Sequence, residues 1–154
     1  MIIQEDSRQQ AGKHDIKHAA FGSAGDTIIR CKLPFGDYAL PPAVAVDTKA
    51  SMQEIAQNIG GTREEHERFK RELIAARDAG CHLYVLVEND EGIASLEEVA
   101  YWTNPRLGIS PKAINGPQLM KAMQTMQLRY GVTFMFCRPD WSAEIIKRLL
   151  RRGT

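Results

Sequence analysis

Apolar residues follow two periods along this chain, and each period predicts one type of secondary structure. Runs that are rich in apolar or β-branched residues predict strands at 2–3, 27–33, 43–47, 82–88 and 132–137. The run at 82–88 is almost continuously apolar, which is typical of a central strand that is covered on both faces. Proline and glycine predict breaks at 34–37 and 41–42, and the spacing suggests that 27–33 and 43–47 form a hairpin-like pair.

Helical periods and capping residues predict five helices, at 51–60, 62–79, 95–102, 118–130 and 142–151. The helix that begins at Thr62 carries many charged residues of both signs, most of which we expect to be solvated. The resulting order of strands and helices predicts an α/β fold with a mixed β-sheet and helices on both sides.

The composition indicates one folded domain over residues 1–154. A mass of 17.3 kDa is ordinary for a domain, and 44% hydrophobic residues suffice for a core. The 20 basic residues nearly balance the 19 acidic ones, which argues against a histone-like binder. Any contact with nucleic acid therefore has to come from a local patch.

No feature of the sequence predicts secretion, a membrane span or a zinc site. No apolar run approaches the roughly 20 residues of a membrane helix, and the acidic N-terminus does not resemble a signal peptide. We therefore expect a cytoplasmic protein with no membrane partner. His14 and His18 have the i,i+4 spacing of two zinc ligands, but no third ligand follows within reach, and the three cysteines are too far apart to form close pairs.

Candidate chemistry lies at the breaks around the third predicted strand. Asp37 is in the turn before this strand, and Asp47 is at its end. Alternation places Asp47 and Lys49 on one face and Thr48 on the other. Two carboxylates in one cleft suit Mg²⁺ or Mn²⁺, and a neighbouring lysine can stabilise negative charge. Taken alone, this pattern is equally compatible with a simple salt bridge.

Three motifs together resemble the XPF–Hef type nuclease domain, a branch of the PD-(D/E)XK nucleases. They are Asp6-Ser7-Arg8-Gln9, Leu33-Pro34-Phe35-Gly36-Asp37-Tyr38 and Val46-Asp47-Thr48-Lys49. The family signatures read D-x-R-E, G-D-Y and E-R-K-x₃-D, in this order. The resemblance extends over roughly residues 2 to 137, through Arg63-Glu64-Glu65-His66 and the strand that ends at Val87-Glu88.

The resemblance implies a restriction-endonuclease-like fold and assigns roles to individual residues. Asp37 and Asp47 are the implied metal ligands and Lys49 the implied catalytic lysine, while Asp6 and Arg8 occupy active-site positions of the first motif. The residues that we expect to contact nucleic acid are Arg8, Gln53, His66, Lys147, Arg148 and Arg151. For His66 a plain surface position is equally open, and for the cations near the C-terminus a helix end that complements the macrodipole is an alternative.

Several positions depart from the family signatures. Asp47 replaces a glutamate, Thr48 an arginine, Gln53 an aspartate and Gln9 the glutamate of D-x-R-E. No helix-hairpin-helix module, which family members usually carry, is recognisable after the last predicted helix. A nuclease core of this kind fits a compact phage or mobile-element protein.

We therefore predict a Mg²⁺- or Mn²⁺-dependent DNA endonuclease that cuts branched or flapped DNA. The alternative is a catalytically degenerate module of the same fold that binds nucleic acid or acts as a scaffold. The resemblance also points to a homodimer, with 118–130 and 142–150 as the candidate interface helices. Their apolar residues could equally fill the core of one monomer.

Overall fold

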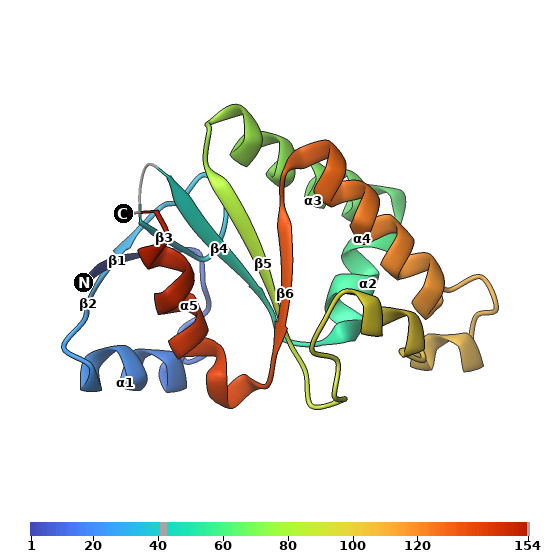
Figure 1. Ribbon diagram of the computed structural model, residues 1–154, viewed down its shortest axis with the longest axis horizontal. Coiled ribbons are helices and arrows are strands. Elements are labelled where there is room, and N and C mark those ends of the chain that lie inside the picture. Colours follow the sequence, from blue (N-terminus) through green and yellow to red (C-terminus); the bar gives the residue numbers. More distant parts are fainter. Residues whose placement is uncertain (41–42, 154) are drawn as a thin grey trace.

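The computed structural model describes residues 1–40 and 43–153 and contains a six-stranded sheet with helices on both faces (Figure 1). The strands are β1 (Ile2–Asp6), β2 (Thr27–Cys31), β3 (Tyr38–Leu40), β4 (Val44–Lys49), β5 (His82–Glu88) and β6 (Thr133–Cys137). The helices are α1 (Asp15–Ser23), α2 (Met52–Gly60), α3 (Arg63–Asp78), α4 (Gly116–Tyr130) and α5 (Ser142–Arg151). Short 3₁₀ helices are η1 (Glu97–Tyr101), η2 (Pro105–Gly108) and η3 (Pro139–Trp141).

The strand order is β2-β1-β3-β4-β5-β6, and β3 runs antiparallel to both of its neighbours. The other pairs, β1 with β2, β4 with β5 and β5 with β6, are parallel. The ends of β1, β4 and β5 therefore lie at the same edge of the sheet as the start of β3. We call it the carboxyl edge, and it brings together polar residues that are far apart in the sequence.

Each face of the sheet has its own core. The larger core lies under α2, α3 and α4, whereas the smaller core lies under α1 and α5 (Figure 1). On α2 and α3 the buried positions are those of the predicted apolar stripes, including Ile55, Ile59, Phe69 and Leu73. The two layers of helices confirm the predicted α/β architecture with a mixed sheet.

The expected pairing of 27–33 with 43–47 is wrong. β2 pairs with β1 in parallel, and β4 pairs instead with β3, a three-residue strand that the sequence pattern did not reveal. Helix α1 was also missed, because it has little apolar periodicity and only Phe21 of its residues is buried. The break predicted at 41–42 lies outside the described residues.

Two expected absences can be compared with the structure. Within residues 1–40 and 43–153, no helix is both long enough and apolar enough to span a membrane. His14 and His18 do not share a partner: the ring of His14 contacts Tyr38 and Gln9, whereas that of His18 contacts Glu5.

Candidate active site

A hollow of about 490 Å³ opens at the carboxyl edge on the side of α3. Four of the residues implied by the resemblance line it: Asp6, Arg8, Asp37 and Asp47. They come from the end of β1, the turn before β3 and the end of β4. Lys49 adjoins this group through an ion pair with Asp47. We call this hollow the acidic hollow.

The turn before β3 is shaped by a glycine. Gly36 has a φ of +73°, a conformation that residues with a Cβ rarely adopt. A Cβ there would also lie 3.2 Å from the carbonyl oxygen of Val46 on β4. The backbone N–H of Gly36 donates to Glu72 on α3 at 2.8 Å, so the turn is tied to both β4 and α3.

Hydrogen bonds from the protein hold both oxygens of the Asp37 carboxylate. Oδ2 accepts from the backbone N–H of Thr48 at 2.8 Å and from its hydroxyl at 2.5 Å. Oδ1 accepts from the side-chain amide of Gln9. Burial raises the pKa of Asp37, an effect that the two bonds from Thr48 oppose. Thr48 and Gln9, two departures from the family signatures, therefore both serve to orient Asp37.

Gln9 is in turn held from the other side by a histidine. Because its amide nitrogen faces Asp37, its Oε1 accepts from Nε2 of His14 at 3.0 Å. The second ring nitrogen of His14 then accepts from the hydroxyl of Tyr38. Burial, together with the nearby charge of Lys17, lowers the pKa of His14 to about 4. The imidazole is therefore neutral at pH 7, and the chain of donors runs from Tyr38 through His14 and Gln9 to Asp37.

Asp47 and Lys49 form a buried ion pair on one face of β4, as alternation predicts. Nζ of Lys49 lies 2.9 Å from Oδ2 of Asp47 and 5.3 Å from the centre of the Phe69 ring. Burial raises the pKa of Asp47 to about 6, although Lys49 opposes this rise. Burial also acts to lower the pKa of Lys49, but Asp47 outweighs it and the pKa rises to about 12. Lys49 is therefore a cation at neutral pH and not a general base.

Glu72 is a member of this site that sequence reasoning missed. It lies on α3, where the run of mixed charges was expected to be mostly solvated, but it is half-buried against the turn at Gly36. Burial raises the pKa of Glu72, and the charge of Asp47 raises it further. Arg68 and Arg71 line the acidic hollow from the same helix. Arg68 precedes Arg71 by three positions and Glu72 by four, and this spacing was the one sequence signal that the three residues share a face of the helix.

Arg8 holds Asp6 in place at the rim of the acidic hollow. Its Nε lies 2.8 Å and 3.1 Å from the two carboxylate oxygens of Asp6, and its terminal amine donates to the carbonyl of Leu33 at 2.5 Å. Asp6 is 5% exposed, whereas the side chain of Arg8 is 56% exposed. Arg8 can therefore face a substrate while it neutralises Asp6.

Two residues that we expected to contact nucleic acid line other hollows. Gln53, on the first turn of α2, lines a pocket between α2 and η2. His66, on the first turn of α3, lines a hollow between α3 and α4, and its Nδ1 donates to the carbonyl of Ile59 at 2.9 Å.

The three cations of α5 lie on the opposite face of the sheet from α3 (Figure 1). Lys147 is only 7% exposed, and its ammonium lies 2.6 Å from Asp26. Arg148 is exposed and pairs with Glu144 at 3.0 Å, one helical turn away. Arg151 is exposed on the last turn of the helix.

The fold and the position of these groups define the class of the protein. A mixed sheet flanked by helices, with carboxylates and a lysine at the edge where β1, β3 and β4 meet, is the restriction-endonuclease-like architecture that the motifs implied. The family model of the ERCC4 domain matches residues 6–149, which is most of the chain. The protein therefore belongs to the ERCC4 domain family.

Solved structures of XPF from Aeropyrum pernix share this fold. One of them aligns with a TM-score of 0.71 at 20% sequence identity and covers 99% of this chain. A second, which is a complex with DNA, aligns with a TM-score of 0.68 at 21% identity over 98% of this chain. In both cases the alignment spans 64% of the archaeal chain. No curated protein sequence matches this chain significantly.

Proposed function

We propose that this protein is a metal-dependent DNA endonuclease that hydrolyses phosphodiester bonds in branched or flapped DNA. The observation that carries the proposal is the acidic hollow: Asp37 and Asp47 are buried beside Lys49 at its wall, in a chain of the ERCC4 domain family. The complex of a similarly folded XPF with DNA supports DNA as the substrate class. The preference for branches rests on the family alone.

The chemistry of Asp37 and Asp47 suits a hard divalent cation such as Mg²⁺ or Mn²⁺. Burial raises the pKa of both carboxyl groups, which is what a bound cation would relieve. Among the residues that the structure describes, no cluster of three or more His, Cys, Asp or Glu side chains is placed to hold a metal. Mg²⁺ is commonly held by one or two carboxylates and several waters, so these two residues fit it.

The residues around the acidic hollow have distinct expected roles. A bound cation would make its water more acidic and stabilise charge on the phosphate. Asp37 and Asp47 would hold that cation, and the charged Lys49 would stabilise the negative charge that develops on the phosphate. Gln9 and Thr48 keep the Asp37 carboxylate in one orientation. Arg8, exposed at the rim, would bind a phosphate of the DNA backbone.

Cleavage of labelled fork, flap and linear duplex DNA by the purified protein tests this function. We expect cleavage of the fork or the flap with Mg²⁺ or Mn²⁺, and none with EDTA. DNA binding without cleavage under every metal condition would support the catalytically degenerate alternative. Undiminished cleavage in EDTA would exclude metal dependence while leaving a nuclease in place.

The homodimer remains a prediction, but several apolar residues of its two candidate interface helices already fill the cores of the single chain. Leu119 and Met123 on α4 and Ile146 and Leu150 on α5 are fully buried in the cores of the single chain. An interface would therefore use other residues of these helices. Light scattering at micromolar concentration, with and without DNA, measures the mass directly.

A further inference from the structure

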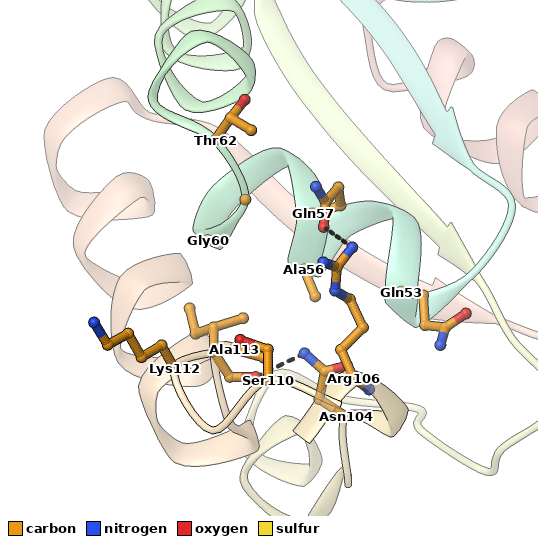
Figure 2. A pocket seen from close by; sticks show the side chains of 12 residues that line it. Gln53, Ala56, Gln57, Gly60, Thr62, Asn104, Arg106, Ser110, Lys112 and Ala113 are labelled. Atoms are coloured by element: carbon orange, nitrogen blue, oxygen red, sulfur yellow. Dashed lines mark hydrogen bonds between the residues drawn. The ribbon is translucent and has the colours of Figure 1, made fainter. Parts of the chain in front are cut away.

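A second hollow, of about 220 Å³, lies between α2 and the segment 104–114, which includes η2 (Figure 2). We call it the Arg106 pocket. Its wall carries two cations and several neutral hydrogen-bonding side chains: Arg106, Lys112, Gln53, Thr62 and Ser110. None of the described residues that line it is an aspartate or a glutamate. In this respect it is the opposite of the acidic hollow.

Arg106 is a guanidinium that no carboxylate neutralises in the part of the chain described here. It crosses the Arg106 pocket toward α2, where its Nη1 donates to Oε1 of Gln57 at 3.4 Å (Figure 2). That partner is neutral, and Gln57 presents its carbonyl oxygen because its amide nitrogen donates to Glu65 at 2.8 Å. By contrast, Arg8 and Arg148 each form a salt bridge with a carboxylate, at 2.8 and 3.0 Å.

The walls of the Arg106 pocket are held by specific contacts. The side chain of Asn104 accepts from the backbone N–H of Arg106 at 3.0 Å and donates to the carbonyl of Ile114 at 2.8 Å, which closes the segment 104–114. Gly60 lets this segment approach α2, since a Cβ there would lie only 2.7 Å from Cβ of Ile114. The donors are therefore arranged before any ligand arrives, which lowers the cost of binding.

We propose that the Arg106 pocket binds a phosphodiester of the DNA substrate other than the scissile one, with Arg106 as the contacting residue. A guanidinium whose hydrogen-bond partner is a neutral amide, in a pocket with no carboxylate among the described residues that line it, is suited to a phosphate. Glu65 lies behind the wall, where it accepts hydrogen bonds from Gln57 and Thr62. The placement of α2 favours DNA as the source of that phosphate. This helix starts three residues after Lys49, so its first turn leads from the acidic hollow to Gln53 in the Arg106 pocket. The inference rests on the proposed nuclease function.

The affinity for fork DNA and its dependence on salt test the proposal. Binding is measured in EDTA, so that no cleavage occurs, for the wild type and for Arg106→Gln, Arg106→Lys and Arg77→Gln. Loss of one phosphate contact should weaken binding roughly tenfold for Arg106→Gln and make the plot of log affinity against log salt shallower by about 1. Arg106→Lys should recover part of the affinity, because it keeps the charge but not the planar fork.

Arg77→Gln is the matched control, since Arg77 is also an exposed arginine, at the far end of α3, and pairs with Asp78. It should leave both the affinity and the salt slope unchanged. Thermal melts check that each variant is folded.

Three results would overturn the proposal. The first is an affinity and salt slope of Arg106→Gln that equal those of the wild type, which would leave the nuclease function standing. The second is binding of inorganic phosphate that depends on Arg106 while DNA affinity does not, which would make the pocket a site for a free anion. The third is a wild type that does not bind DNA at all, and this result would also remove the proposed function.

Discussion

Buried carboxylates occur on both faces of the sheet, but their partners differ. On the face of α1 and α5 each of them meets a basic side chain: Asp26 contacts Lys147 at 2.6 Å, Glu88 contacts Lys17 at 2.7 Å, and Glu5 contacts His18 at 2.5 Å. The hydrogen bond from Lys147 holds the pKa of Asp26 below its ordinary value. These charges are neutralised within the fold.

On the face of α3 the buried carboxylates outnumber the buried cations, since Arg8, Arg68 and Arg71 line the same hollow but are exposed. Asp37 and Asp47, both buried, and the half-buried Glu72 lie around a single buried ammonium, that of Lys49. Burial, reinforced by mutual repulsion, raises the pKa of each of the three carboxyl groups. Buried charges that are fully paired indicate a structural role, whereas buried carboxylates in excess of buried cations, beside a hollow, indicate a site for a cationic ligand.

The largest expected effect concerns catalysis by the residues of the acidic hollow. Asp47→Asn and Lys49→Met should each lower the single-turnover rate of fork cleavage by at least about 10³-fold, because both groups act mainly on the transition state. Lys49→Met keeps an apolar stem against Phe69, so the fold should persist. DNA affinity in EDTA should change only a few-fold. Wild-type turnover in Lys49→Met would contradict the role assigned to the ammonium.

The next effect concerns stability on the paired face. Lys147→Met should lower the free energy of unfolding by about 3 kcal/mol, because it leaves the buried Asp26 with only the N-terminal amine, 3.0 Å away. Arg148→Met, one residue further along the exposed side of α5, should cost less than about 0.5 kcal/mol. Urea unfolding measures both. Equal losses in the two variants would show that burial of the pair does not matter.

A smaller effect should appear in the pH dependence of stability. The folded pKa of His14, about 4, lies below its ordinary value of 6.5, so its contribution is complete above pH 6.5 and is lost as the pH falls toward 4. Asp47 acts with the opposite sign, since its pKa of about 6 makes the folded state gain stability as the pH falls below 6.

His14→Gln isolates the first of these two contributions. Between pH 6.5 and 4 the wild type should lose about 2 kcal/mol more than this variant. The measurement is urea unfolding of both proteins at several pH values. Parallel curves for the two proteins would mean that His14 titrates alike in the folded and unfolded states.

The smallest effect concerns the orientation of Asp37. Gln9→Ala removes the amide that donates to Oδ1 and should weaken Mn²⁺ binding about tenfold, as loss of a hydrogen bond to a ligand commonly does. Gln10→Ala, at the adjacent exposed position, is the control and should bind Mn²⁺ like the wild type. Calorimetric titration without DNA reads the affinity independently of cleavage. Unchanged affinity in Gln9→Ala would show that Thr48 suffices to hold Asp37.

Local signals in the sequence predicted most of the helices and the central strand. Ser51 and Thr62 cap α2 and α3 as expected, each accepting from a backbone N–H three residues on, at 3.0 and 3.2 Å. The strand at 82–88 and the helix at 142–151 have the predicted bounds. These features depend on capping and on apolar periodicity, which are properties of a few neighbouring residues. The motifs around Asp37 and Asp47 were equally readable.

Only the tertiary structure revealed which of these residues meet. Helix α1 shows little periodicity because polar side chains attach it to the sheet: His14, Lys17 and His18 each contact a buried group on a different strand. In the sequence, Glu72 is one of many charged residues on α3. In the structure, it accepts a hydrogen bond from the backbone of the turn at Gly36. The parallel pairing of β1 with β2, and the position of β3 between β1 and β4, bring these residues together. Contacts such as those of Gln9 with Asp37 and of Gly36 with Glu72 join residues far apart in the sequence and leave no local pattern. The sequence therefore predicted most of the elements, whereas the tertiary structure decided which residues form the site.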